Sequence, residues 1–538
     1  MLSKIKIVFL FIAILAIAVF FRFHKITETP PGLYPDEAAN GVNALDALSR
    51  NDWKVFYPEN NGREGLFMNI QSLSVKYFGA HPWSLRIVSG MFGVLTVAGL
   101  FFLARLLWSP AIALLASYLM AISFWPVNFS RIGFRAVMLP FILVWAFYFL
   151  LKGFAVKNRL LVFIAGLLYG VGFHTYISWR ISPLLLGLLF LVLLFDKTRT
   201  KKSTIKFGFI FLIGTIIALS PLAYYYLQNP SDFMGRAAQV SIFNSESPEK
   251  ALAESVIKTL GMFNVRGDSN WRHNFSGRPE LFWPIGIAFL IGLLLILRHS
   301  MSSADHLGAK LLSGSLASCF LVFWLIVMLL PNFLAPEGAP HALRALGAMP
   351  AVFVISAIGL DRIYKFTQRK MDREAAMPKN LKYAKQIGRI KKELSLLAAL
   401  FLIFTGVWEY RTYFVVWANR PEVSENFDQR LADIGNYLKN LPDETKKYVI
   451  INETGTIAKG VPIQAQSIMF LAYDKNINYI NSSEISNLPN NLSNAVIIPT
   501  KSDAEISNSI KQKYHLSREV DFITFKAIKV RNNSEKLR

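Results

Sequence analysis

The chain has 538 residues, of which 53% are hydrophobic and 17% are charged. Soluble domains carry roughly 25% charged residues, so this composition argues against a single soluble globule and excludes a disordered or fibrous chain. The only cysteine, Cys319, lies in an apolar run. A disulfide framework and a cysteine-based metal or redox site are therefore excluded.

The formal net charge of +23 belongs almost entirely to the first 418 residues, because residues 419–538 hold 16 Lys and Arg against 14 Asp and Glu. In a soluble protein such an excess would suggest nucleic acid. Here it accompanies apolar segments, where basic residues set membrane topology and contact anionic lipid. We therefore expect membrane lipids as partners and no nucleic acid.

Eleven apolar runs predict an all-α polytopic membrane domain of about 11 transmembrane helices. The first run follows Lys4 and Lys6 without a small-residue cleavage site, so we expect a signal anchor rather than a removed signal peptide. The runs at 137–151 and 160–173 are short for a bilayer core of about 30 Å, which leaves their ends the least defined. The runs lie at about 5–21, 85–104, 110–126, 137–151, 160–173, 181–195, 206–226, 281–297, 311–331, 346–360 and 394–410.

The loops between these runs predict the orientation. With a cytoplasmic N-terminus, the inner loops carry a large excess of Lys and Arg over acids, most clearly at 361–393. This predicts a multi-pass protein of the plasma (inner) membrane whose N-terminus is cytoplasmic and whose C-terminal part is extracytoplasmic. The outer loops favour Arg over Lys, whereas the inner loops favour Lys. Arg forms bidentate contacts with phosphate, so an outer anion site and simple interfacial anchoring both explain this bias.

Two outer loops are long, at 22–84 and 227–280. The first contains helix-like stretches after Pro35 and over 64–77, where apolar side chains repeat at helical spacing, as in helices that lie on a membrane surface. From about 419 the pattern changes to strand candidates at 448–452, 477–481, 495–499 and 522–530, separated by helical patterns. We therefore expect a membrane domain over 1–418 and a small soluble extracytoplasmic α/β domain over 419–538.

The segment PGLYPDEAANGVNALDAL at 31–48 follows the first span directly. Pro35 with Asp36 and Glu37 is an ordinary helix start, since proline suits the first helical position and acids suit the first turn. The same carboxylates, held at the outer membrane surface, could instead act as a general base on an acceptor hydroxyl. Both interpretations fit these residues.

A short cytoplasmic start, one span, and an Asp-Glu pair opening a long outer loop of amphipathic helices together resemble the integral-membrane glycosyltransferases of the C superfamily. The resemblance is to the protein O-mannosyltransferase and aminoarabinose-transferase-like group, and it covers about residues 1–410. It implies an outer-face site, a sugar donor on a polyprenyl phosphate, Asp36 as the base and Glu37 as its neighbour.

Other outer polar residues are candidates for substrate binding. Arg63 and Glu64 lie in the first loop, where Glu64 could ligate a divalent metal or orient a sugar, or simply cap structure. Arg131 and Arg135 lie four apart, so they would face one way if this segment is helical and could then form a phosphate clamp; interfacial anchoring is the alternative. The remaining candidates in short outer turns, where interfacial anchoring is the common alternative, are His174, Tyr176, Arg180, His341 and Arg344.

No histidine spacing defines a metal site, so a divalent metal ion stays open. Nucleotide sugars are cytosolic, so an outer site must receive its sugar on a lipid that has been flipped across the membrane. The predicted function is thus transfer of a sugar from a polyprenyl-phosphate donor to a hydroxyl of a lipid, polysaccharide or protein acceptor. The alternatives are a flippase or exporter of lipid-linked saccharide, which would place charged or broken segments inside the spans, and a membrane scaffold.

Overall fold

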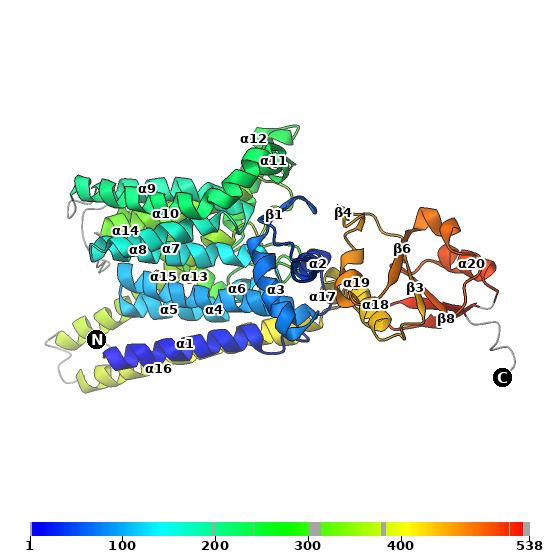
Figure 1. Ribbon diagram of the computed structural model, residues 1–538. Coiled ribbons are helices and arrows are strands. Elements are labelled where there is room, and N and C mark those ends of the chain that lie inside the picture. Colours follow the sequence, from blue (N-terminus) through cyan, green and yellow to red (C-terminus); the bar gives the residue numbers. More distant parts are fainter. Residues whose placement is uncertain are drawn as a thin grey trace. The chain divides into compact units, whose positions relative to one another are not determined.

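Figure 1 shows a computed structural model of the chain, which describes residues 3–195, 200–239, 241–300, 314–377, 384–515 and 517–530. The chain divides into two compact units. Unit 1 comprises 1–24, 89–131 and 135–417, and unit 2 comprises 25–88, 132–134 and 418–538. The sequence placed one boundary near 418, and the chain passes between the units there. Unit 2, however, also takes in the first outer loop, and the division into 1–418 and 419–538 stays a prediction.

Unit 1 is a bundle of helices (Figure 1). Each of the eleven apolar runs lies in helical structure over its described residues, apart from short stretches at the ends and a break at Ser123. The helices, including α4, which begins in unit 2, are α1 (Lys4–Phe23), α4 (Pro82–Leu107), α5 (Pro110–Ile122), α6 (Phe124–Phe129), α7 (Met138–Ala155), α8 (Arg159–Gly172), α9 (Ser182–Phe195), α10 (Lys201–Gln228), α11 (Pro230–Gln239), α12 (Pro248–Gly261), α13 (Trp283–Ser300), α14 (Gly314–Phe333), α15 (Met349–Ala376) and α16 (Ala384–Tyr410).

Seven helical segments in the described part of the chain are long and apolar enough to cross a membrane. They are α1, α4, α10 and α14, and the segments Arg135–Ala155, Ile177–Phe195 and Leu346–Ala376, in which a 3₁₀ turn precedes α7, α9 and α15. Three shorter apolar helices, α5, α8 and α13, correspond to predicted spans. The last predicted span lies in α16, whose first half is strongly charged. The structure thus supports a polytopic membrane protein, and the count of eleven spans stays a prediction.

Glycines allow two pairs of membrane helices to pack backbone against backbone. A Cβ added at Gly166 of α8 would lie 2.1 Å from a carbonyl oxygen of α10, and one added at Gly214 of α10 would lie 2.6 Å from a carbonyl oxygen of α8. Helices α13 and α15 approach in the same way through Gly292 and Gly359, where the corresponding distances are 2.0 and 1.9 Å. Close contact through small residues replaces the hydrophobic effect, which does not drive helix association in lipid.

Unit 2 contains a five-stranded mixed sheet of order β6-β3-β7-β9-β8, in which β3 runs parallel to β6 and β7, and β9 runs antiparallel to β7 and β8. Three predicted strands are confirmed, and the fourth run, 522–530, forms a strand only over its second half. The strands are β3 (Lys446–Ile451), β6 (Ile477–Asn481), β7 (Ala495–Pro499), β8 (Ser517–Asp521) and β9 (Lys526–Val530), beside the two-residue pair β4 (Ile457–Ala458) and β5 (Val461–Pro462).

Helices cover both faces of this sheet. Leu431 of α18 (Gln429–Lys439) and Ile468 of α19 (Ala465–Leu471) pack with Val449 on one face. Ile506 and Ile510 of α20 (Ala504–Lys513) pack with strand residues on the other. This layered packing explains the alternation of strand and helix patterns in the sequence.

The first outer loop joins the same unit. It contains α2 (Pro35–Ser49), the hairpin β1 (Phe56–Tyr57) and β2 (Arg63–Glu64), and α3 (Leu66–Phe78), and α17 (Pro421–Asn426) precedes α18. Ala38 and Val42 of α2 form a buried cluster with Phe470 and Leu471 of α19, and Figure 1 shows these two helices side by side. The approach at Gly41 is so close that an added Cβ would lie 2.5 Å from the Phe470 ring. The apolar face of α2 is therefore buried against protein rather than exposed at a membrane surface.

Candidate functional site

Asp36 lies in the first turn of α2. Pro35 begins the helix and the two acids lie in its first turn, as the sequence predicted, and Tyr34 precedes the helix without a side-chain cap. The Asp36 carboxylate is half-buried, and its Oδ1 accepts a hydrogen bond of 2.6 Å from Asn60 Nδ2. Asn60 is its only side-chain partner in the described part of the chain. Asp36 therefore keeps accessible carboxylate surface and has the acceptor capacity that a base requires.

Glu37, the next residue, is completely buried and fully engaged. Its Oε1 and Oε2 accept hydrogen bonds of 3.0 and 3.1 Å from Arg86, and Oε1 also accepts one of 2.7 Å from the Gly133 amide. Arg86 also donates to the carbonyl oxygens of Pro30 and Gly32 at 2.5 and 2.9 Å. These contacts join α4, the segment before α2 and the 132–134 segment, so Glu37 holds Asp36 in position.

The same face of α2 continues with two asparagines. Asn40 Nδ2 donates to the Gly133 carbonyl at 3.0 Å, while Arg63 Nη1 and Nη2 donate to the side-chain oxygens of Asn40 and Asn43 at 2.7 and 2.6 Å. Arg63 and Glu64 are both buried in the short hairpin. Their predicted roles in sugar or metal binding stay predictions, and the observed contacts of Arg63 fix the hairpin against α2.

The sequence overlooked several residues of this network. Arg86 lies within a predicted membrane span, so it was counted as part of an apolar run. Asn40, Asn43 and Gly133 were not selected either. One signal was available, because polar side chains at 37, 40 and 43 repeat every three residues along one face of α2.

Arg131 and Arg135 do not share a helical face, because residues 131–134 are not helical and Arg135 begins a short 3₁₀ helix. The condition for a shared helical face, that the segment is helical, is therefore not met. The buried Arg131 guanidinium donates to the Phe21 and Arg22 carbonyls at 3.1 and 2.8 Å and lies 4.9 Å from the Phe414 ring centroid. The predicted donor contact of each arginine stays a prediction.

Three candidates lie around the turn after α8. Arg135 is 5.6 Å from the ring centroid of Tyr176, so two predicted site residues meet here. A ring nitrogen of His174 is 2.9 Å from the Ala218 carbonyl. Arg180 bonds Tyr226 Oη at 2.9 Å and stacks on Phe233. Aromatic rings and carbonyls thus order these side chains, whose substrate contacts stay predictions.

His341 and Arg344 border a polar cavity of about 420 Å³ in unit 1. Arg344 Nη1 donates to the carbonyl oxygens of Ala335 and Glu337 at 2.8 and 2.6 Å. Two residues that were not candidates, Asp268 and His273, line the cavity as well. The cavity therefore joins the loop before α13 to the turn after α14, which are far apart in the sequence.

Asp268 is the centre of this cavity wall. Its Oδ2 lies 3.0 Å from His273 Nδ1 and 3.9 Å from His341 Nδ1, and the ligand atoms of the three residues all lie within 4.8 Å of one another. Glu280 Oε1 accepts a hydrogen bond of 3.0 Å from the Asp268 amide. Burial, followed by the Asp268 charge, raises the pKa of Glu280 well above its ordinary value. One carboxylate and two imidazoles form a donor set suited to a divalent transition metal.

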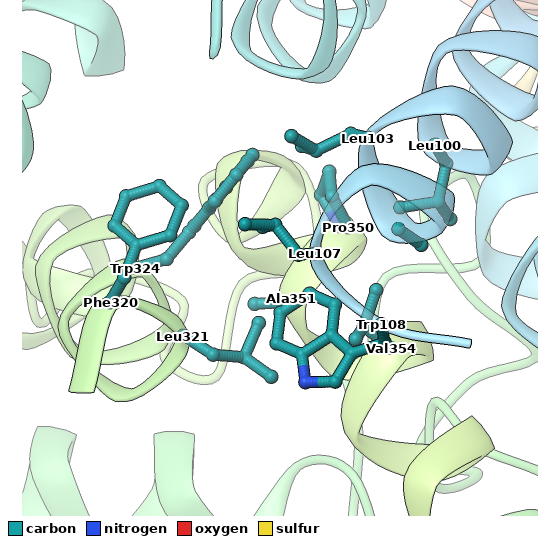
Figure 2. A pocket seen from close by; sticks show the side chains of 11 residues that line it. Leu100, Leu103, Leu107, Trp108, Phe320, Leu321, Trp324, Pro350, Ala351 and Val354 are labelled. Atoms are coloured by element: carbon teal, nitrogen blue, oxygen red, sulfur yellow. The ribbon is translucent and has the colours of Figure 1, made fainter. Parts of the chain in front are cut away.

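A second pocket offers no such chemistry. Figure 2 shows that only apolar side chains line it, from α4, α14 and α15 and the residue after α4. Its volume of about 10 Å³ has room for about one water molecule. It is a packing gap in unit 1 and not a site for a sugar or a phosphate.

Comparison with known proteins agrees with the expected resemblance. The family described as dolichyl-phosphate-mannose-protein mannosyltransferase matches residues 66–225. A search of curated protein sequences finds no significant match. The chain is similar to the integral-membrane glycosyltransferases of the C superfamily, in the mannosyltransferase- and ArnT-like group, so the resemblance inferred from sequence is confirmed.

Solved structures share the fold at low sequence identity. ArnT from Cupriavidus metallidurans, bound to undecaprenyl phosphate, has a TM-score of 0.60 at 12% identity, with 99% of each chain covered. The oligosaccharyltransferase AglB from Archaeoglobus fulgidus, in complex with an inhibitory peptide and a dolichol-phosphate, has a TM-score of 0.52 at 14% identity, covering 99% of this chain and 75% of AglB. With the apolar helices of unit 1, these similarities establish an integral membrane protein of this fold.

Proposed function

We propose that this protein is a glycosyltransferase that moves a sugar from a polyprenyl-phosphate donor to an acceptor hydroxyl at the outer face of the membrane. The family match at 66–225 supports this activity. The similar folds of ArnT and AglB, which were solved with undecaprenyl phosphate and a dolichol-phosphate, support the class of donor. The acceptor is a hydroxyl of a lipid, polysaccharide or protein.

The difference between the environments of Asp36 and Glu37 is the observation that carries this proposal. Glu37 is buried with a bidentate arginine partner, whereas Asp36 is half-buried with a single neutral donor on one oxygen. If the two acids served only to start the helix, the fixed position that the contacts of Glu37 give to the accessible Asp36 would have no purpose. We therefore assign Asp36 as the base and Glu37 as a positioning residue.

The reaction follows from these roles. The acceptor oxygen attacks the anomeric carbon, the bond from this carbon to the phosphate oxygen breaks, and its electron pair leaves with polyprenyl phosphate. The acceptor proton passes to the Asp36 carboxylate and later to solvent. Because the attack is direct, the product has the inverted anomeric configuration. Polyprenyl phosphate is already a good leaving group, so the acceptor hydroxyl needs a base more than the donor needs an acid.

Asn60 has a defined part in this scheme. Its amide donates to Asp36 Oδ1 at 2.6 Å, which leaves Oδ2 to meet the acceptor proton. Asn60 adopts a left-handed backbone conformation with φ of 52°, which asparagine tolerates better than most residues. The geometry of the loop therefore sets the direction in which the base faces.

Sugar transfer by purified protein in lipid nanodiscs, supplied with synthetic polyprenyl-phosphate sugars, tests the proposal. General-base catalysis contributes about 10² to 10⁴ in rate, so Asp36→Asn should lose turnover on that scale while it keeps its thermal stability. Asp52→Asn is the matched control, because Asp52 lies in the same loop and forms an ion pair with Lys54 at 3.0 Å. Full activity of Asp36→Asn would remove Asp36 from the mechanism.

The sugar and acceptor require a second measurement. Mass spectrometry of envelope glycolipids and glycoproteins, with and without the gene, should reveal a mass difference of one sugar residue. Flipping of a lipid-linked saccharide across sealed vesicles that contain the protein, without any transferred sugar, would favour the exporter instead.

A further inference from the structure

We propose that Asp268, His273 and His341 bind a zinc-type metal ion at the wall of the polar cavity in unit 1. All three side chains line this cavity of about 420 Å³. The proposal concerns residues that the sugar-transfer mechanism does not use. It stands independently of Asp36, because metal binding can be measured in the absence of any transfer.

The distances suit tetrahedral coordination. Zinc bonds of about 2.0 to 2.2 Å at tetrahedral angles place neighbouring ligand atoms about 3.3 to 3.6 Å apart. The observed separations from Asp268 Oδ2 are 3.0 Å to His273 Nδ1 and 3.9 Å to His341 Nδ1, on either side of this range. The largest separation within the set is 4.8 Å. Small rotations of the two rings therefore bring the three atoms around one ion.

The surrounding structure holds the ligands before any metal binds. The Asn270 amide donates to Asp268 Oδ1 at 2.8 Å and the Ala342 amide donates to Oδ2 at 2.9 Å, so the carboxylate is oriented from both sides. The rings of His273 and His341 lie 4.7 Å apart between centroids. Ligand orientation by such outer hydrogen bonds is typical of metal sites.

The donor atoms decide the class of metal. Magnesium and calcium prefer sites made only of oxygen ligands, whereas two imidazoles with one carboxylate suit zinc and neighbouring transition metals. Three protein ligands leave a fourth tetrahedral position, as in zinc sites that bind water or substrate. The three ligands line a cavity with room for that fourth ligand, and Arg344 lines the same cavity. An oxygen anion is therefore the class of additional ligand that the site would take.

A purely structural role for Asp268 is the competing explanation, because its hydrogen bonds already join the loop before α13 to the turn after α14. The two explanations differ in the part they give His341. Its Nδ1 is 3.9 Å from Asp268 Oδ2, beyond hydrogen-bond distance, so removing His341 leaves the hydrogen bonds of Asp268 in place. A metal site would lose a ligand.

The test uses the full-length protein, purified in detergent and stripped with a chelator. Titration with Co²⁺, followed by its visible absorption, should show one equivalent in tetrahedral coordination, and Zn²⁺ should displace it. His341→Ala and His273→Gln should each weaken binding by at least about tenfold. His515→Gln is the control, since His515 is an exposed histidine after α20 in unit 2 and should leave the titration unchanged.

Each outcome decides the proposal. Loss of the Co²⁺ spectrum in His341→Ala, with unchanged thermal stability of the metal-free protein, supports the site. Absence of stoichiometric binding to the wild type overturns it, as does binding by His341→Ala and His273→Gln that equals binding by the His515→Gln control. Asp268→Asn, which retains a hydrogen-bond acceptor but loses the charge, should also lose Co²⁺, and normal Co²⁺ binding by this variant would contradict the assigned ligand set.

Discussion

Removal of Arg86 should destabilise unit 2 more than any change at Asp36. The Glu37 and Arg86 side chains are 0 and 1% exposed, and they share two hydrogen bonds of 3.0 and 3.1 Å. In Arg86→Ala, the hydrogen bond that remains to the buried Glu37 carboxylate among the described residues is the one from the Gly133 amide, at 2.7 Å. Breaking a buried pair in this way costs about 3 to 5 kcal/mol, because an uncompensated charge remains.

This cost converts to a large thermal shift. For a unit of roughly 150 to 250 residues, each kcal/mol lowers Tm by about 2 to 4 °C, so Arg86→Ala should lower the unfolding midpoint by about 6 to 20 °C. Tryptophan fluorescence of the purified protein in detergent would report the transition. Sugar transfer, measured well below the midpoint, should fall less than in Asp36→Asn if Arg86 acts through position alone.

A double-mutant cycle gives the sharper test. Glu37→Gln alone leaves a buried arginine that still bonds the Pro30 and Gly32 carbonyls, so it should cost less than Arg86→Ala. Glu37→Gln combined with Arg86→Ala should be more stable than the sum of the single losses, since the unpaired carboxylate is gone. Additive losses, or an Arg86→Ala midpoint within about 2 °C of wild type, would refute the reasoning.

Three further predictions concern other parts of the chain. Arg131→Ala should lower stability by about 1.5 to 3 kcal/mol in thermal unfolding, because two carbonyls lose a charged donor, whereas Arg135→Ala should mainly weaken saturation by the donor; the reverse order would contradict these roles. Burial raises the pKa of Glu280, so the stability it contributes is full below its ordinary pKa and is lost as pH rises through the folded pKa. Glu280→Gln mimics the protonated form, so in metal-free protein the Tm of this variant should increase relative to the wild-type Tm as pH rises from about 5 to 8. A Tm difference between variant and wild type that does not change with pH would argue against a raised pKa. Reporters fused after Lys392 should read cytoplasmic and those after Asn419 outside, and a cytoplasmic signal from the latter would show that the span count is wrong by an odd number.

Local patterns in the sequence determined much of the fold. Long apolar runs became helices because burying their backbone and side chains in lipid favours a helix wherever the run lies in the chain. Pro35 and the acids after it placed the start of α2 for equally local reasons. Three strands of the mixed sheet followed from short apolar runs of β-branched residues.

Tertiary structure decided which polar groups meet. Glu37 and Asp36 are adjacent in sequence, but Arg86, 49 residues from Glu37, made one of them a structural anchor and left the other accessible. No local pattern in the sequence shows which of the two acids pairs with Arg86, because the partner of a buried charge depends on which residues pack next to it. Arg131 and Arg135 show the opposite case, in which residues close in sequence do not share a face. Their spacing of four would place them on one face only if the intervening residues were helical.

The cavity of unit 1 shows the same limit. His273 and His341 are 68 residues apart, and neither has a second histidine at metal-binding spacing. Asp268 brings them together because its carboxylate bonds the Ala342 amide on one side and His273 on the other. In the same way, the sequence indicated a helix after Pro35 but not that α19, more than 400 residues later, would cover its apolar face. The sequence shows that an apolar face must be covered and that a buried charge must be paired. Which residues cover or pair with it is decided only in the folded chain, because these residues are far apart in the sequence and folding brings them together.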